Sequence, residues 1–179
     1  DIGRSGDAEG QFICPCGIDL DSQENIYVTD EWMNRISIFD KDGEFLGKWG
    51  SPGGDDGQFN GPVGIAIDQE DNLFIVDSHN HRVQKLTKDG KFLGKWGSLG
   101  SGDGELNAPW GITTDAKGYV YVADHKNHRV QKWSPQGEFL LQFGSPGDGP
   151  GELRYPSDVT VDPAGDIYVC DWANNRVQV

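Results

Sequence analysis

The 179-residue chain has few of the residues that form disulfide frameworks and common metal sites: three cysteines, four histidines and one methionine. Three cysteines without regular spacing do not make a disulfide framework. No HExxH, paired-cysteine metal, phosphate-loop or nucleophile-elbow motif is present. No apolar run approaches the roughly 20 residues needed to cross a bilayer. We therefore expect a soluble protein without a membrane span and without a recognisable catalytic motif.

Positive charge is also scarce, because 15 basic side chains face 29 acidic ones, for a formal net charge of −14. An acidic surface repels phosphates, so we expect no nucleic-acid partner. Such a surface suits a cationic peptide, a basic patch on a protein, or a divalent cation. Acidic loops also serve simply to keep a protein solvated, and charge alone does not separate these possibilities.

Repetition is what the sequence does contain. The hexapeptide "NHRVQK" occurs at 80–85 and again at 127–132, 47 positions later. Sliding the chain over itself by this step exposes four copies without insertion or deletion. The residues in register are Asp30, Asp77, Asp124 and Asp171; Arg35, Arg82, Arg129 and Arg176; Asp21, Asp68, Asp115 and Asp162; and Pro15, Pro62, Pro109 and Pro156.

Each copy has the period of strands. In the second copy the pattern predicts strands over 63–67, 73–77, 82–87 and 91–96, with a loop at 78–81. "DG" at 89–90 predicts a two-residue hairpin turn with left-handed backbone at both positions. Four short antiparallel strands at a period in the forties indicate a β-propeller blade, within an all-β fold. We expect one domain over 1–179, with repeats at about 3–50, 51–97, 98–144 and 145–179.

The two ends of the chain do not coincide with repeat boundaries. "DIG" at 1–3 aligns with "KWG" at 48–50, and "RVQV" at 176–179 stops inside the third strand of its copy. We therefore expect an arc that is incomplete at both ends. Unpaired strand edges and apolar blade faces at those ends predict self-association. The alternative is a four-bladed ring closed by the first residues, but three residues are few for a strand.

The segment "PVGIAIDQEDNLFIVDSHNHRVQKLTKDGKFLGKWGS" at 62–98 resembles an NHL repeat, typified by "NHR" at 80–82 and 127–129 and "NNR" at 174–176. Asp158, in place of a glycine, and "EWMNR" at 31–35 depart from the pattern. The resemblance implies a closed propeller, commonly of six blades, so that about two blades would be absent here. The family spans protein-binding scaffolds, RNA-binding modules and a metal-dependent lyase, so function must be argued from the site.

Residues that recur in every copy predict structural roles. An Asp at a strand end and an Arg five residues later can bind loop amides and pair with each other. Trp49, Trp96 and Phe143 close the first three copies, and strand alternation predicts that they fill the space between blades. In "CPC" at 14–16 a disulfide across one residue would be strained, so we interpret the cysteines as small buried side chains, with the redox compartment left open.

Differences between copies predict the binding site. The glycine-rich loop into each blade and the loop between its second and third strands emerge on one side, called the loop face here. Trp32 and Trp172 occupy loop positions where other copies have different residues, and Trp110 starts an innermost strand. Large aromatic residues dominate binding hot spots, although these rings can equally cover neighbouring loops. The predicted ligand-binding residues are Trp32, Trp110, Trp172, His79, His125, Asp55, Asp56 and Asp103.

The main functional hypothesis is a non-enzymatic scaffold that binds a protein or peptide, cationic in view of the acidic loops, without a cofactor. His79 and His125 break the repeat pattern, and with nearby carboxylates they could supply zinc ligands; loop oxygens could also hold calcium. The alternative is therefore a metal-dependent lyase or hydrolase resembling peptidyl-α-hydroxyglycine α-amidating lyase. That resemblance implies zinc-binding histidines from separate blades, whereas the histidines here lie in two adjacent copies only.

Overall fold

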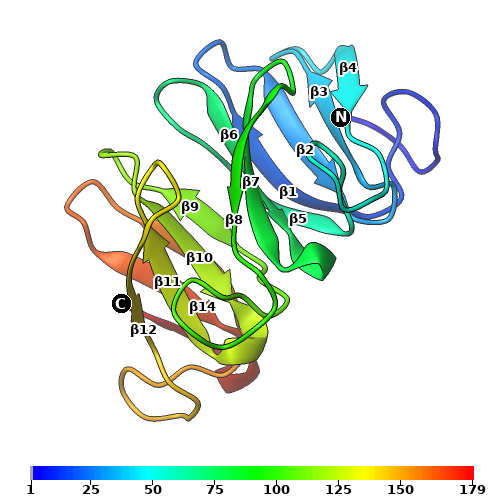
Figure 1. Cartoon of the computed structure of the whole chain (residues 1–179). Coiled ribbons are helices and arrows are strands. Elements are labelled where there is room, and N and C mark those ends of the chain that lie inside the picture. Colours follow the sequence, from blue (N-terminus) through cyan, green and yellow to red (C-terminus); the bar gives the residue numbers. More distant parts are fainter. Residues whose placement is uncertain (1) are drawn as a thin grey trace.

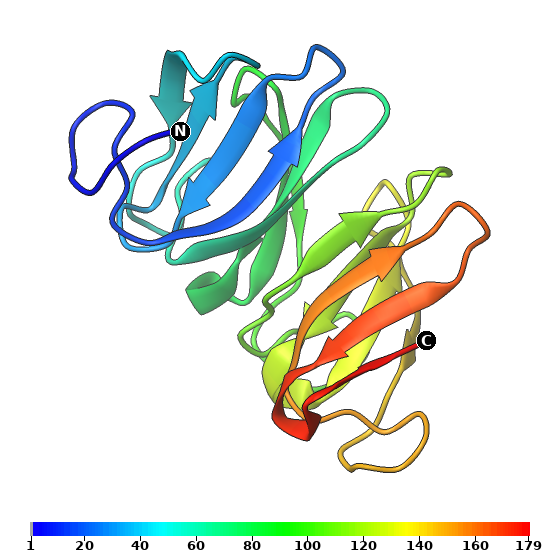
Figure 2. The same ribbon diagram turned by 180° about the vertical axis from the view of Figure 1, so that it is seen from behind.

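The computed structural model describes residues 2–179 as four antiparallel sheets that follow one another in chain order (Figures 1 and 2). Blade 1 contains β1 (Pro15–Leu20), β2 (Ile26–Asp30), β3 (Arg35–Phe39) and β4 (Phe45–Trp49). Blade 2 contains β5 (Pro62–Ile67), β6 (Asn72–Asp77), β7 (Arg82–Thr87) and β8 (Phe92–Trp96). Blade 3 contains β9 (Ile112–Thr114), β10 (Val120–Asp124), β11 (Arg129–Trp133) and β12 (Phe139–Phe143), and blade 4 contains β13 (Pro156–Val161), β14 (Ile167–Asp171) and β15 (Arg176–Gln178).

Within each sheet the strands lie in sequence order, and the first strand of each blade is innermost because it contacts the first strands of neighbouring blades. The neighbouring inner strands β1, β5, β9 and β13 contact one another in turn. Three 3₁₀ turns, η1 (Ser78–Asn80), η2 (His125–Asn127) and η3 (Trp172–Asn174), connect second to third strands on the loop face. Within residues 2–179, no helix is long and apolar enough to cross a membrane. The all-β propeller fold predicted from the repeat is confirmed.

The hairpin turn at 87–91 differs from the prediction. Only Gly90 has left-handed backbone (φ +79°), whereas Asp89 does not. The Gly90 N–H donates to the carbonyl of Thr87 at 2.8 Å, and the Thr87 N–H donates to the carbonyl of Lys91. This is a three-residue connection in which the glycine forms a bulge, the next most common hairpin geometry. The two-residue turn was a wrong prediction, because the "DG" pair fits both geometries.

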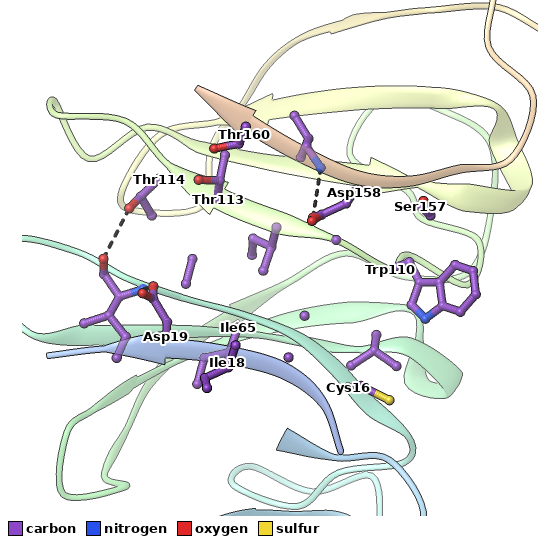
Figure 3. A pocket seen from close by; sticks show the side chains of 18 residues that line it. Cys16, Ile18, Asp19, Ile65, Trp110, Thr113, Thr114, Ser157, Asp158 and Thr160 are labelled. Carbon is purple, nitrogen blue, oxygen red and sulfur yellow. Dashed lines mark hydrogen bonds between the residues drawn. The ribbon is translucent and has the colours of Figure 1, made fainter. Parts of the chain in front are cut away.

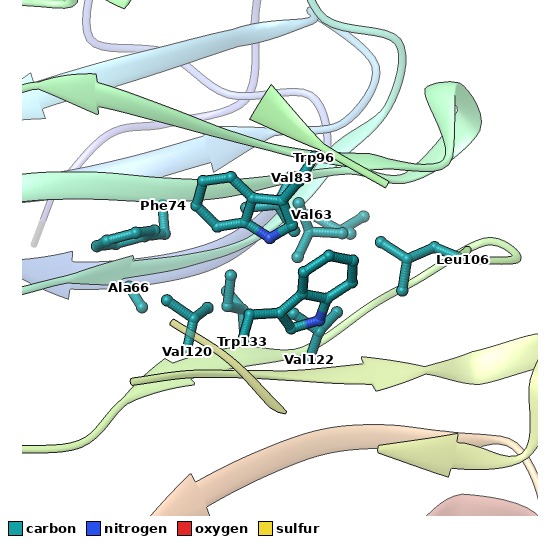
Figure 4. Close-up of a cluster of buried hydrophobic side chains, with 11 residues drawn as sticks. Val63, Ala66, Phe74, Val83, Trp96, Leu106, Val120, Val122 and Trp133 are labelled. Carbon is teal, nitrogen blue, oxygen red and sulfur yellow. The ribbon is translucent and has the colours of Figure 1, made fainter. Parts of the chain in front are cut away.

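Aromatic side chains fill the spaces between blades, as predicted for Trp49 and Trp96. Trp96 from β8 lies 6.2 Å from Trp133 of β11 and 5.9 Å from Phe74 of β6, measured between ring centroids (Figure 4). Trp49 from β4 packs on Phe59, which precedes blade 2. Phe143 packs against the buried cluster that joins blades 3 and 4, made of Tyr121, Ala123, Val130, Leu153, Val159 and Val169.

The repeated Asp and Arg form the predicted brace in blades 2, 3 and 4. Arg82 Nε donates to Asp77 Oδ2 at 2.7 Å, and its remaining nitrogens donate to the carbonyls of Gly54, Asp55 and Gln58 in the glycine-rich loop. The same Arg–Asp contact measures 2.7 Å at Arg129–Asp124 and Arg176–Asp171. Buried charges of this kind are stable only when paired and fully hydrogen-bonded, and here both conditions are met. The brace therefore fixes each loop on its blade.

Blade 1 departs from this arrangement. Asp30 accepts the backbone N–H groups of Ile13, Cys14 and Met33. Arg35 donates to three loop carbonyls, but its buried Nε has no hydrogen-bond partner among the described residues. The predicted Asp–Arg pair is therefore wrong for this blade, where the sequence "EWMNR" already departs from the repeat.

Candidate ligand-binding site on the loop face

The start of each inner strand and the loop after the second strand meet on the loop face. In blade 3 the Trp110 N–H donates to the carbonyl of Ala123 at 2.9 Å, and the Ala123 N–H donates to the carbonyl of Gly111. This pairing places Trp110 beside His125, the first residue of η2. In blade 3, backbone contacts therefore bring together two side chains that differ between the copies.

Four side chains from blades 3 and 4 form an aromatic cluster, made of Trp110, His125, Tyr155 and Trp172. His125 lies at its centre: its ring centroid is 4.6 Å from Trp110, 5.2 Å from Tyr155 and 6.3 Å from Trp172. Trp172 is 61% exposed, and Trp110 and Tyr155 are both more than one-third exposed. These rings therefore contact one another while keeping large apolar surfaces open to solvent, which is typical of hot-spot residues at interfaces.

The protonation of His125 follows from its surroundings. Burial lowers the pKa of His125 below its usual value, and the nearby His128 and Lys126 lower it further, although the contact with Pro156 opposes this shift. Nδ1 lies 3.1 Å from the carbonyl oxygen of Pro156, so in the neutral ring Nδ1 carries the hydrogen and donates. Nε2 is then left as an acceptor, in the middle of an exposed aromatic surface.

A cavity of about 630 Å³ runs between the inner strands of all four blades (Figure 3). Trp110, Ser157 and Cys16 lie at one end of it, and Asp19 and Thr114 lie at the other. Burial raises the pKa of both Asp19 and Asp158, which line this cavity. The aromatic cluster therefore adjoins the mouth of a cavity with an apolar wall and several hydrogen-bonding groups, the usual composition of a ligand site.

The other predicted ligand-binding residues lie elsewhere on the loop face. Trp32 is 71% exposed on blade 1. The His79 ring packs over Gly61 in blade 2. Asp55, Asp56 and Asp103 lie on glycine-rich loops, which the arginines of the third strands hold in place. Asp56 Oδ1 is 2.6 Å from Lys95 Nζ of the outermost strand β8. The structure thus brings together Trp110, Trp172 and His125 but not the remaining five.

Among residues 2–179, one group of three or more His, Cys, Asp or Glu side chains has converging donor atoms: Cys14, Cys16 and Glu31, called the thiol cluster here. Neither His79 nor His125 belongs to it.

Cys16 and Cys170 are exposed and Cys14 is half-buried, so the interpretation of the cysteines as buried side chains was wrong. Desolvation and the neighbouring Cys14 raise the pKa of the Cys16 thiol to about 12, and desolvation also raises the pKa of Cys14.

Sequence reasoning missed Tyr155 and the thiol cluster for a common reason. Tyr155 and Cys14 occupy the same repeat position, one residue before the aligned proline, and Trp172 and Glu31 both follow the aligned aspartate. Both clusters therefore use the same two repeat positions, whose proximity to other side chains carries no sequence signal. Examined singly, each residue is an unremarkable loop substitution.

Comparison with protein families gives a direct match. The NHL repeat model matches residues 59–86, 106–133 and 153–179, which begin in the glycine-rich loops and run into the third strands of blades 2, 3 and 4. Blade 1, which lacks the brace, is outside the matched ranges.

Curated relatives share single stretches of about one repeat. Protein lin-41 of Caenorhabditis elegans is 40% identical over 47 residues, which are 26% of this chain and 4% of that protein. Protein brain tumor of Drosophila melanogaster is 42% identical over 52 residues, 29% of this chain and 5% of that protein. NHL repeat-containing protein 3 of Homo sapiens is 42% identical over 48 residues, 26% of this chain and 14% of that protein. The matches thus span only a small part of these relatives.

Solved structures share the fold over most of the chain. A streptogramin B lyase structure has a TM-score of 0.70 at 20% identity, covering 91% of this chain and 50% of that one. A virginiamycin B lyase from Staphylococcus aureus has the same TM-score and identity, covering 92% of this chain and 51% of that one. At this identity the likeness shows the fold alone. The three matched repeats coincide with blades 2, 3 and 4, so this β-propeller contains NHL repeats in those blades.

Proposed function

We propose that this propeller is a binding scaffold whose aromatic cluster receives a protein or peptide segment at the mouth of the central cavity. The observation that carries the proposal is the convergence of Trp110, Tyr155 and Trp172 around His125, with all three outer rings exposed. Exposed large aromatic residues gathered at one mouth, beside a cavity, mark interaction sites more often than isolated ones.

The chemistry of the cluster favours a mixed ligand, with an apolar side chain and a hydrogen-bond donor. Two indole rings and a phenol supply apolar faces. Nε2 of neutral His125 supplies an acceptor, and the indole N–H groups supply donors. The faces of Trp and Tyr also attract a lysine or arginine side chain within about 6 Å of a ring centroid, worth roughly 0.5–2 kcal/mol. A basic residue flanked by an apolar one is therefore the peptide feature that we expect to bind.

The acidic glycine-rich loops would act at longer range. The loop that carries Asp55 and Asp56 contacts the third strand of blade 2, and Asp56 is already paired with Lys95 of the fourth strand. Asp103 lies in the corresponding loop of blade 3, which contacts Arg129. Exposed charges at such distances raise association rates in low salt and contribute little to the final contact. We therefore assign them a steering role for a cationic partner.

The test is a selection from a random peptide library on the 179-residue chain, followed by calorimetric measurement of Kd for the enriched peptides. Trp110→Ala and Trp172→Ala should each weaken binding by about 2 kcal/mol, roughly thirtyfold, with an unchanged melting temperature. Trp32→Ala is the matched control, because Trp32 lies on the same face, is the most exposed tryptophan and is outside the cluster. It should leave Kd unchanged.

Two outcomes would contradict the proposal. Peptides that bind Trp110→Ala and Trp172→Ala as tightly as the unchanged chain would place the site elsewhere. A lowered melting temperature with unchanged Kd would show that the rings only cover neighbouring loops.

The enzyme alternative draws no specific support from the geometry of His79 or His125, and the likeness to lyases concerns the fold alone.

A further inference from the structure

We infer that Cys14, Cys16 and Glu31 form a binding site for a zinc-class divalent cation at the rim of the central cavity, on blade 1. The one ligand atom that each side chain offers lies within 4.8 Å of the other two. Both thiol sulfurs are 3.7 Å from the same carboxylate oxygen, Glu31 Oε2. The site is distinct from the aromatic cluster, which blades 3 and 4 supply.

The distances suit a tetrahedral cation after a small adjustment. Zinc–sulfur bonds of about 2.3 Å and zinc–oxygen bonds of about 2.0–2.2 Å place tetrahedral donors roughly 3.3–3.8 Å apart. The three donors therefore need to approach by at most about 1 Å. Cys16 is exposed and Glu31 half-buried, so rotation of these two side chains can supply the movement without disturbing the core.

The backbone holds the three residues in place before any ion arrives. The Cys14 N–H donates to Asp30 Oδ1 at 3.1 Å, and the Glu31 N–H donates to the carbonyl of Cys14 at 2.9 Å. Pro15 between the cysteines fixes its own φ, and the extended segment places Cys14 and Cys16 on the same side. A site whose ligands are already positioned loses little conformational entropy on binding.

Blade 3 shows that the same two repeat positions also meet outside blade 1, whereas the chemistry at these positions is specific to blade 1. The residue pair that corresponds to Cys16 and Glu31 is Trp110 and His125 in blade 3, where the two rings lie 4.6 Å apart. The corresponding residues in blade 2 are Val63 and Ser78, and in blade 4 Ser157 and Trp172. Packing therefore does not require sulfur or carboxylate at these positions, and blade 1 alone combines two thiols with an acid.

The donor set selects the kind of cation. Thiolate sulfur favours zinc and similar soft or borderline ions over magnesium and calcium, which prefer all-oxygen sites. Two thiolates and a carboxylate give three protein ligands, which leaves one tetrahedral position for water or a ligand atom. Because Cys16 lines the cavity together with Trp110, that position adjoins the cavity mouth.

The experiment is titration of the fully reduced 179-residue chain with Co²⁺, whose thiolate complexes absorb in the near-ultraviolet and visible. We expect one Co²⁺ per chain, a thiolate charge-transfer band, and displacement by an equimolar amount of Zn²⁺. Cys14→Ser and Cys16→Ser should each abolish the band. Glu31→Gln should weaken binding while keeping the thiolate band, because both sulfurs remain.

Cys170→Ser is the matched control, since it removes an exposed thiol outside the cluster, and its titration should equal that of the unchanged chain. Melting temperatures without metal separate a lost ligand from a lost fold, and Glu31→Gln keeps the test decisive if a cysteine variant unfolds. Absence of a thiolate band in the unchanged chain would overturn the inference. So would a band that persists in Cys16→Ser or disappears in Cys170→Ser.

Discussion

The polar side chains of "NHRVQ" in blade 2 make two kinds of contact, one to the glycine-rich loop of the same blade and one to the next blade. Asn80 Nδ2 donates to the carbonyl of Gly53 and to Asp77, and Arg82 and Gln84 also hold the same glycine-rich loop. His81 acts on the next blade, where the Ala108 N–H donates to its Nδ1 at 3.0 Å. The repeat is therefore both a brace within a blade and a hydrogen bond between blades. Sequence reasoning predicted the brace but not the contact between blades, because its backbone donor lies 27 residues away and carries no sequence signal.

The contact of His81 makes stability depend on pH. Burial, together with the nearby His79 and Lys126, lowers the pKa of His81 below its usual value of about 6.5. The unfolded chain therefore binds a proton more readily than the folded one, so this contribution to stability is present above pH about 6.5 and is lost as the pH falls through the folded-state pKa. Protonation also removes the Nδ1 acceptor that Ala108 uses. We expect the melting temperature to fall when the pH is lowered from about 7.5 to about 5.5.

The variant His81→Asn tests whether His81 causes this pH dependence of the melting temperature. Asn34 already makes the equivalent contact, accepting the Gly61 N–H at 2.8 Å from the same left-handed backbone conformation. The variant should keep the contact between blades and show a smaller fall in melting temperature on acidification. His125, whose pKa is also lowered, accounts for part of the remaining fall. An equal fall in both proteins would show that His81 is not responsible.

At the scale of the strands, most of the predicted architecture was correct, because strands are set by local alternation and by a repeat present in four copies. The predicted strands 63–67, 73–77, 82–87 and 91–96 differ from β5, β6, β7 and β8 by at most one residue at an end. What the pattern could not reveal is proximity across elements. The turn glycine Gly137, for example, lies against Trp96 of the preceding blade, a contact between residues 41 positions apart.

That contact predicts a specific difference between two turn glycines. Gly137 and Gly165 both end a turn, with φ of +87° and +96°. A Cβ at Gly137 would lie 2.6 Å from Trp96 Cε3, whereas a Cβ at Gly165 would meet nothing within 4 Å. Gly165→Ala should cost about 1–2 kcal/mol through left-handed backbone alone. Gly137→Ala should cost a further 1–3 kcal/mol or so, because the indole must move.

Urea unfolding of the two variants measures this difference as a change in midpoint at constant slope. The pair is matched for backbone conformation and for the turn hydrogen bond, which measures 2.9 Å at Gly137 and 3.0 Å at Gly165. Equal destabilisation would mean that the Trp96 side chain moves aside at little cost, and that its close packing at this turn contributes nothing to the free energy of unfolding.

At the scale of the whole molecule, three buried clusters join the four blades in series. One links blades 1 and 2 through Tyr27, Ile36 and Phe59, and another links blades 3 and 4 through Tyr121, Leu153 and Val159. The middle cluster contains Trp96, Phe74 and Val63 from blade 2 with Trp133 and Leu106, from blade 3 and its loop (Figure 4). The stability of a repeat array is approximately a sum of such nearest-neighbour interfaces. The function is less predictable at this scale, because the aromatic and thiol clusters use positions where the repeat is free to vary.

The middle interface can be weakened separately from the other two by a single substitution. Removing one of the two tryptophans of this cluster, by Trp96→Ala, should cost about 3–5 kcal/mol and leave the outer two interfaces intact. The unchanged chain should unfold in one transition, whereas the variant should unfold blades 3 and 4 separately from blades 1 and 2. Hydrogen exchange followed by peptide mass measurement resolves the two halves, because strands that open together lose protection together. Trp172→Ala, at an indole that is 61% exposed, is the matched control and should keep a single transition. Uniform loss of protection across all four blades in Trp96→Ala would contradict the serial arrangement and show that the propeller unfolds as one unit even when its central contact is removed.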